Sequence, residues 1–252
     1  MPSKRQHKKG TNHWQTVTRS VWVLFVFSLA GIAVYAGIYY EKNTVIEDVQ
    51  FSGNYFTKSE SLLEAIESPV GLYADSVDYV RISTDLKKLP YVNNVNVNMT
   101  LRGVLHFRVN EYEPIAMLVD GNRRVYVTGG GIKLPIKPGK ARDVPIVYGF
   151  PATPANDTLQ TIAFKHVEEF LRAAKQNDTG WVTISEITWN EHEGVVALTH
   201  EYAVKLIFGQ DNFHEKLMHW EAFYTEVVMR KGMNRFSSID LRFRDQIVTK
   251  HS

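Results

Sequence analysis

The sequence predicts an α+β protein in which a single N-terminal transmembrane helix is followed by two domains. The first domain has the order β-α-α-β-β, and the second is β-rich with mixed α/β structure. An uncharged run of 21 residues near the N-terminus predicts the transmembrane helix. Runs that alternate between apolar and polar residues predict strands with one buried face, and longer segments with apolar residues at helical spacing predict amphipathic helices.

The uncharged run at residues 20–40 is expected to span a bilayer. A helix of this length rises about 30 Å, roughly the thickness of the hydrocarbon core. The charged side chains before it are all basic, and basic flanks favour the cytoplasmic side. We therefore expect a cytoplasmic basic tail at residues 1–19, a lipid bilayer around residues 20–40, and about 210 residues on the opposite side.

A cleaved signal peptide is the alternative interpretation of this run. Ala33 and Ala36 have the spacing of small residues at a signal-peptidase site. However, the apolar run is longer than the usual signal-peptide core of about 7–15 residues. The length therefore favours an uncleaved anchor.

Composition excludes several classes of function. After residue 40 the chain holds 24 basic and 27 acidic residues, which argues against a nucleic-acid surface. The chain has no cysteine. This absence excludes a disulfide framework, a thiolate metal site and a cysteine nucleophile.

Residues 44–113 are predicted to form the first domain. A β-branched and aromatic run at residues 45–51 predicts its first strand. Two short amphipathic helices are expected at residues 58–67 and 79–88. Thr57 is the expected N-cap of the first helix, with Glu60 three residues later completing a capping box.

The clearest alternation in the chain predicts a hairpin at the end of this domain. Apolar residues alternate with asparagines over residues 94–101, and the alternation resumes over residues 105–109. Arg102-Gly103 between the two runs provides the turn. One face of this hairpin is expected to be buried and the other solvated.

Residues 114–252 are predicted to form the second domain. Gly/Pro-rich residues 128–140 indicate a loop. The expected helices cover residues 158–175 and 213–228, and the expected strands cover residues 115–119, 124–127, 144–148, 183–189, 195–199, 203–208 and 238–244.

The sequence contains no convincing pattern of catalytic or metal-binding residues. His214 and His219 are five residues apart, which is the wrong spacing for a zinc pair on one helical face. The glycines at 129–131 lack the Lys-Ser/Thr of a phosphate loop. We therefore expect no enzyme, no cofactor and no metal. A membrane-anchored enzyme acting on peptidoglycan or other envelope sugars stays open as the alternative, because catalytic groups also assemble from distant positions.

Five short motifs occur in a characteristic order, at Val45–Asn54, Leu89–Val95, Val109–Ala116, Asp143–Gly149 and Ile239–Phe243. In order and spacing they resemble the bacterial cell-division family FtsQ, called DivIB in some bacteria. Val144 stands where the family usually has leucine. The likeness covers nearly the whole chain. It implies that residues 44–113 form a POTRA domain and residues 114–252 the FtsQ-type β domain.

The resemblance also implies a function. Members of the family are non-enzymatic scaffolds in the cytoplasmic membrane at the division septum, with their folded domains on the extracytoplasmic side. They couple early division proteins to septal peptidoglycan synthesis. The POTRA domain is implicated in contact with FtsK, and the C-terminal strand binds FtsB, within the FtsB–FtsL pair, by strand addition.

Carried over by position, the binding edge covers Ser238 to Gln246. The expected partner-binding residues are Ser238, Ile239, Asp240, Leu241, Arg242, Phe243, Arg244 and Gln246. Among them, Arg242, Phe243 and Arg244 are the expected side-chain contacts. Strand alternation buries Phe243, whereas the family has an exposed aromatic at the matching place, so both placements stay open.

Overall fold

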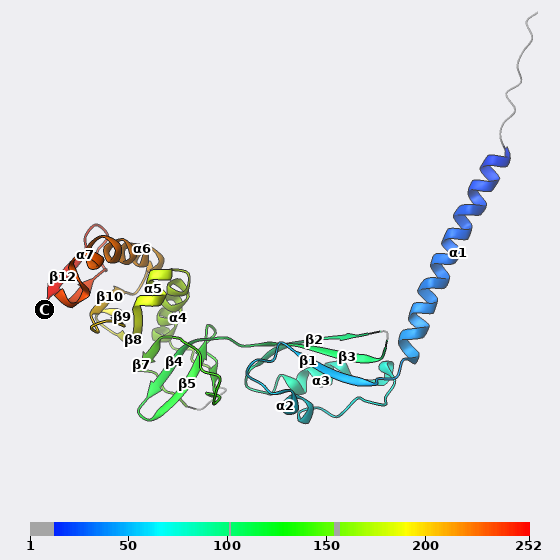
Figure 1. The fold of residues 1–252 in the computed structure, drawn as a ribbon, viewed down its shortest axis with the longest axis horizontal. Coiled ribbons are helices and arrows are strands. Elements are labelled where there is room, and N and C mark those ends of the chain that lie inside the picture. The colour runs from blue at the N-terminus through cyan, green and yellow to red at the C-terminus, as the bar shows by residue number, and fades with distance from the viewer. Residues whose placement is uncertain (1–12, 101, 154–156) are drawn as a thin grey trace, which may run out of the picture.

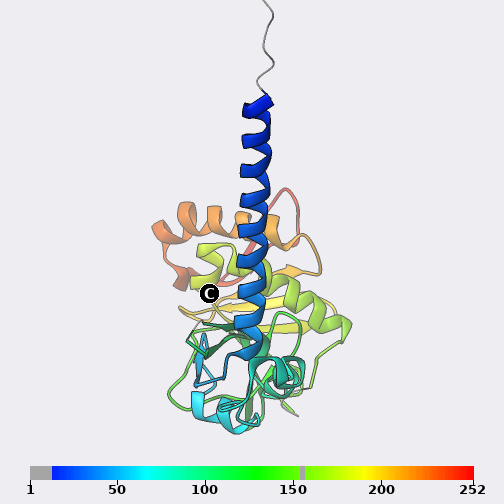
Figure 2. The ribbon, with the colours of Figure 1, turned by 90° about the vertical axis from the view of Figure 1, so that its right-hand side faces the viewer.

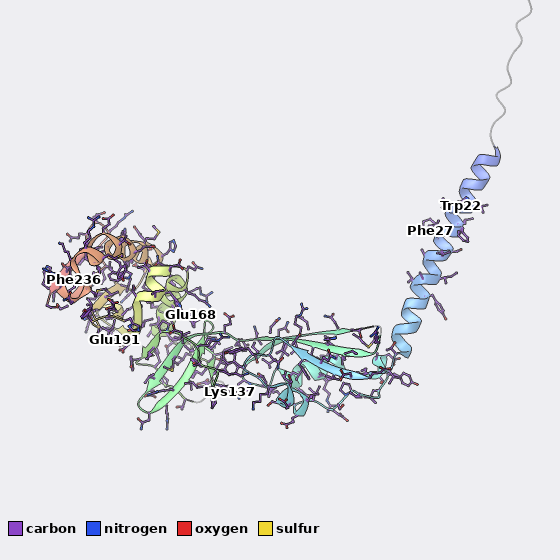
Figure 3. The ribbon with its side chains drawn as sticks, viewed as in Figure 1. Trp22, Phe27, Lys137, Glu168, Glu191 and Phe236 are labelled. Atoms are coloured by element: carbon purple, nitrogen blue, oxygen red, sulfur yellow. The ribbon has the colours of Figure 1, made fainter. Side chains whose placement is uncertain are left out.

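The computed structural model describes residues 13–100, 102–153 and 157–252, which form a long helix followed by two domains (Figure 1). Helix α1 covers His13–Asn43, and the predicted basic tail at residues 1–19 lies largely outside the described residues. The described side chains of α1 are exposed. Among them, Trp22 and Phe27 project from the helix without neighbours in the two domains (Figure 3).

Among the described residues, no helix is both long enough and apolar enough to cross a membrane. Part of the predicted span, including Ser20 and residues 38–40, lies outside the residues whose side chains the structure describes.

The first domain has the predicted order β-α-α-β-β. In its sheet, the order is β1-β3-β2, with β1 parallel and β2 antiparallel to the central strand β3. Its elements are β1 (Asp48–Ser52), α2 (Ser59–Glu64), the 3₁₀ turn η1 (Ala74–Ser76), α3 (Tyr79–Leu86), β2 (Val92–Met99) and β3 (Val104–Glu111).

The predicted hairpin is confirmed as β2 and β3. Leu105, Phe107 and Val109 on β3 are all buried, and they pack against Leu62 of α2 and Leu86 of α3. The two helices therefore cover one face of the sheet. The other face carries the polar side chains of the alternating pattern, which accounts for the period of two in the sequence.

The predicted capping box at the start of α2 is wrong. Lys58 is the N-cap residue, without a side-chain hydrogen bond. Thr57 is instead buried, and its backbone N–H donates to the carboxylate of Glu111 at 2.7 Å. The N–H of Phe56 donates to the same carboxylate at 2.6 Å. A charged acceptor at the end of β3 thus ties the segment that precedes α2 to the sheet.

The second domain is built on one mixed sheet with helices on one face. Within the described residues this sheet has nine strands, in the order β12-β11-β10-β9-β8-β7-β4-β5-β6. Its strands are β4 (Pro114–Asp120), β5 (Arg123–Thr128), β6 (Lys133–Leu134), β7 (Ile146–Tyr148), β8 (Ile184–Asn190), β9 (Gly194–Thr199), β10 (Lys205–Gly209), β11 (Phe236–Asp240) and β12 (Val248–His251). The short strand β6 lies in the segment predicted as a loop.

Aromatic side chains hold the helices of the second domain to its sheet. Phe170 lies 4.6 Å from Phe208 of β10 and 5.5 Å from Phe213, measured between ring centroids. Trp220 is fully buried and donates its indole N–H to the hydroxyl of Thr183 at 2.9 Å. The helical elements are α4 (Ile162–Lys175), α5 (Asp178–Thr183), α6 (Phe213–Phe223), the π-helical turn η2 (Tyr224–Val228), α7 (Met229–Lys231) and the 3₁₀ turn η3 (Met233–Arg235).

The predicted helices of the second domain are confirmed with two differences. Helix α4 begins later than expected because the hydroxyl of Thr161 caps it, accepting the N–H of Phe164 at 3.2 Å. The segment predicted as one helix over residues 213–228 changes to π-helical geometry at Tyr224. Helix α5 was not predicted; it is capped by Asn177, whose side chain accepts the N–H of Gly180 at 2.6 Å.

The two domains meet through an aromatic junction, formed by the buried residues Phe56, Tyr91, Tyr126 and Leu134. Phe56 and Tyr91 come from the first domain and stack with their ring centroids 4.2 Å apart. The Tyr91 hydroxyl donates to the carbonyl of Pro135 in the second domain at 2.7 Å. Burial, with the neighbouring Tyr126 and Glu111, raises the pKa of Tyr91, so the hydroxyl keeps its proton at any physiological pH.

A cation extends the aromatic junction towards solvent. The guanidinium of Arg142 lies 4.2 Å from the ring centroid of Tyr55 and 5.2 Å from that of Phe56. The backbone N–H of Arg142 donates to the hydroxyl of Tyr126 at 2.9 Å. Lys140 also donates to the carbonyl of Tyr55. The junction therefore combines apolar burial, a cation–π contact and directional hydrogen bonds.

Truncating Phe56 tests whether the junction fixes the relative orientation of the domains. Phe56→Ala removes the stacked ring and is expected to cost about 3–5 kcal/mol of packing free energy. We expect a broader distribution of distances between spin labels placed on α3 and α4, measured by double electron–electron resonance. Leu63→Ala, on the half-exposed side of α2, is the control that should leave the distribution unchanged. Equal distributions for wild type and Phe56→Ala would contradict a restraining role.

Candidate functional site at the C-terminal edge

Strand β11, which contains the first predicted site residues, lies inside the sheet. It pairs in parallel with β10, through Ser238 and Lys205, and antiparallel with β12, through Ser238 and Lys250. The expectation that Ser238–Asp240 form a free edge is therefore wrong. The chain returns after residue 247 and covers this strand, so the outermost strand on this side is β12 (Val248–His251).

The connection between β11 and β12 carries the other predicted site residues. Leu241 is 1% exposed, and its N–H still donates to the carbonyl of Ile207 in β10 at 2.9 Å. Phe243 is 45% exposed, and Arg244 and Gln246 are exposed as well. The alternation that would bury Phe243 fails because β11 ends at Asp240, so the aromatic side chain lies on the surface.

Asp240 and Arg242 form a local lock where the strand ends. The guanidinium of Arg242 makes a bidentate contact with the Asp240 carboxylate, at 2.9 Å from Nε and 2.6 Å from Nη2. The backbone N–H of Arg242 donates to the same carboxylate at 3.1 Å. This side-chain acceptor replaces a ladder partner and turns the chain out of the sheet.

The lock shifts the pKa values of both of its groups. Burial alone would raise the pKa of Asp240, but the hydrogen bonds from Arg242 and the positive charges of Arg242 and Lys205 hold it below its usual value. The same hydrogen bond raises the pKa of Arg242. Both groups therefore stay ionised and paired beside the exposed connection.

A shallow hollow of about 500 Å³ lies beside this connection. Residues around the N-terminal end of α6 line one side, and Arg242, Phe243 and Arg244 line the other. The buried Lys216 also lines the hollow, and its ammonium group donates to the carbonyl and the carboxylate of Asp211 at 2.7 and 2.9 Å. The hollow therefore offers the ring of Phe243 among side chains of both charges, because Asp211 and Glu215 line it together with the basic residues. Two of the basic groups are already paired, Arg242 with Asp240 and Lys216 with Asp211. No group of three His, Asp or Glu side chains among the described residues could hold a metal ion.

The structure brings Arg242, Phe243 and Arg244 together and adds residues that the sequence did not indicate. Asp211, Glu215 and His219 line the hollow but lie more than 20 residues earlier in the chain. Strand β12 was also missed as an element of its own, although the β-branched sequence Ile247-Val248-Thr249 is a signal for it. Ser238, Ile239 and Leu241 support the site from inside the sheet.

The Asp240–Arg242 lock predicts a pH-dependent contribution to stability. The folded-state pKa of Asp240 is depressed, so this contribution is fully present above the unfolded-state pKa of about 3.9 and is lost as the pH falls through the lower folded value. Arg242→Ala should lower the free energy of unfolding by about 1 kcal/mol at pH 7. In urea titrations this difference from wild type should shrink below about pH 4. An equal difference at pH 7 and pH 3 would contradict the lock.

Comparison with known proteins assigns both domains to one family. Residues 44–112 match the model of the FtsQ-type POTRA domain, and residues 113–250 match the C-terminal-related model of FtsQ/DivIB. The chain is 28% identical to the cell division protein FtsQ of Rhodothermus marinus over 198 residues, covering 75% of this chain and 70% of that protein. It is 24% identical to the FtsQ of Salinibacter ruber over 225 residues, covering 85% of each.

A solved structure also matches part of the chain. The major extracytoplasmic domain of the cell-division protein DivIB from Geobacillus stearothermophilus aligns with a TM-score of 0.33 and 18% identity. The alignment covers 48% of this chain and 98% of that domain. The assignment rests on the two family models, which together cover the chain from the first strand to the last. The chain is therefore a member of the FtsQ/DivIB family of bacterial cell-division proteins.

Proposed function

We propose that this protein is a non-enzymatic scaffold of the division machinery, anchored in the cytoplasmic membrane by α1 and acting through partner binding at the septum. The observation that carries the proposal is the succession of the two family domains over residues 44–250. The FtsQ relatives are named as cell division proteins. The scaffold couples early division proteins to septal peptidoglycan synthesis.

The exposure of α1 supports the anchor. Large apolar side chains on all sides of this helix, including Leu24, Phe27 and Ile32, are more than half exposed. A helix that is apolar all round needs an apolar environment, and lipid supplies one. The basic residues before it favour a cytoplasmic N-terminus. Both domains then lie on the extracytoplasmic side, where the POTRA domain is proposed to contact FtsK and other division proteins.

The outer edge of β12 supports a strand-addition site for FtsB, within the FtsB–FtsL pair. An edge strand presents unpaired N–H and C=O groups that a partner strand can complete. The connection that leads into β12 exposes Phe243 and Arg244, which also line the hollow; Phe243 would serve as an apolar anchor and Arg244 as a charged contact. Backbone pairing along β12 would supply affinity, and these side chains would select a partner segment that carries acidic and apolar residues.

A glutamate introduced at Phe243 or at Arg244 tests the side-chain part of this proposal. Phe243→Glu and Arg244→Glu should each weaken binding of an FtsB segment about tenfold or more, because contact with an apolar anchor or a complementary charge is lost. Binding would be measured by calorimetry, together with thermal melting of each variant. Ile162→Glu is the matched control, because Ile162 is 75% exposed on α4 and takes no part in the hollow. Unchanged affinity of both test variants, with normal melting, would refute the assignment.

Strand addition also predicts a specific pattern of amide protection. When the FtsB segment binds, backbone amides within Val248–His251 should exchange with solvent more slowly, because ladder bonds form along the outer edge. Hydrogen-exchange mass spectrometry of the full chain in lipid nanodiscs would measure this change. Peptides from β2, an outer strand of the POTRA sheet, serve as the control. Protection in β2 but not in β12 would move the FtsB site to the POTRA domain.

A further inference from the structure

The end of the POTRA domain next to α1 carries an exposed apolar surface. It consists of Val45, Val70, Leu72 and Tyr73, which we call the α1-side surface. These side chains are between 39% and 55% exposed. They come from two segments, residues 44–46 and 69–76, that lie side by side through an antiparallel bridge between Val45 and Tyr73.

Backbone hydrogen bonds fix the α1-side surface in place. The N–H of Ile46 donates to the carbonyl of Leu72 at 2.9 Å, and its carbonyl accepts the N–H of Gly71 at 2.8 Å. The N–H of Ala74 donates to the carbonyl of Thr44 at 3.0 Å. Ile46 is fully buried beneath the surface. Ile46 thus already fills the core at this end of the domain, and the side chains of the α1-side surface stay exposed.

The α1-side surface lies where the helix meets the domain. The turn η1, which follows directly after Tyr73, contacts the end of α1 (Figure 1). The tip of the β2–β3 hairpin lies at the same end, because the carbonyl of Gly103 accepts the N–H of Glu47 at 2.9 Å. This tip carries the exposed Arg102. The second domain adjoins the opposite end of the POTRA domain (Figure 1).

The composition of this surface fits the polar–apolar boundary of a bilayer. Aliphatic side chains bury area there, tyrosine has an apolar body with a polar tip, and arginine pairs with phosphate. Glu47 and Asp75 are exposed nearby, so the surface is not basic overall. Its affinity for lipid would therefore come from apolar burial rather than from attraction to anionic headgroups.

We infer that the α1-side surface is a second membrane contact, seated in the interfacial layer of the bilayer that holds α1. The inference rests on the proposed anchor, because α1 brings this surface to the lipid. A POTRA domain that hung from α1 alone would be free to tilt. A contact at Leu72 and Tyr73, beside the helix, fixes the tilt of the domain against the membrane plane.

The absence of cysteine from the chain makes a clean labelling experiment possible. Single cysteines at Leu72, at Val26 within α1 and at Leu63 on α2 would carry an environment-sensitive nitrobenzoxadiazole label. Leu63→Cys is the matched control, since Leu63 is 44% exposed and Leu72 is 49% exposed in the same domain. The full-length protein would be placed in phosphatidylcholine nanodiscs that contain lipid with a nitroxide at carbon 5 of the acyl chain.

Quenching and a blue-shifted emission at Leu72 and Val26, with neither at Leu63, are the results expected from a second membrane contact. Tyr73→Glu should then lower the quenching at Leu72, whereas Leu63→Glu should not. Quenching at Val26 without quenching at Leu72 would overturn the inference and leave the anchor standing. Equal quenching at Leu72 and Leu63 would also overturn it, because the domain would lie on the lipid without a specific surface. No quenching at Val26 would refute the anchor itself.

Discussion

Burial of Phe56 against Tyr91 is the contact on which the arrangement of this protein depends. These two POTRA residues form one small cluster with Tyr126 and Leu134 of the β domain. The guanidinium of Arg142 lies over the ring of Phe56. Glu111 holds the backbone at Phe56 and Thr57 from the last strand before the second domain. The two domains are thus packed together at the same place where the chain passes from one to the other, and each contributes residues to one shared hydrophobic cluster.

The sequence predicted the regular parts of the fold because burial there follows a simple period. The asparagine-spaced alternation of β2 and the apolar stripe of α4 each report one buried face. Features built by distant side chains did not follow from sequence. The carboxylate of Glu111 holds the backbone that precedes α2 from 54 residues away, and no local pattern encodes that contact. Helix α5 is too short to show a helical period.

The C-terminal site shows where local patterning stops being informative. The alternation over residues 238–244 predicts a strand that continues through Phe243. In the structure, the carboxylate of Asp240 instead accepts hydrogen bonds from the backbone N–H and the guanidinium of Arg242. This lock ends β11, exposes Phe243 and lets β12 return along the sheet. The residues named from family resemblance are still neighbours in space. Their roles divide, because Ile239 and Leu241 are core residues whereas Phe243 and Arg244 face solvent.

Strand β12 lies at the far end of the second domain, and the POTRA domain lies between that domain and α1 (Figure 1). The row of two domains runs at a steep angle to the axis of α1 instead of continuing it (Figures 1 and 2). With α1 in a bilayer, a segment added to β12 would be held to one side of the helix, at a lateral distance given by two domain lengths and one stiff joint. A partner with its own membrane helix would reach that strand only from a position displaced sideways from α1. The geometry would therefore select partners by reach as well as by sequence.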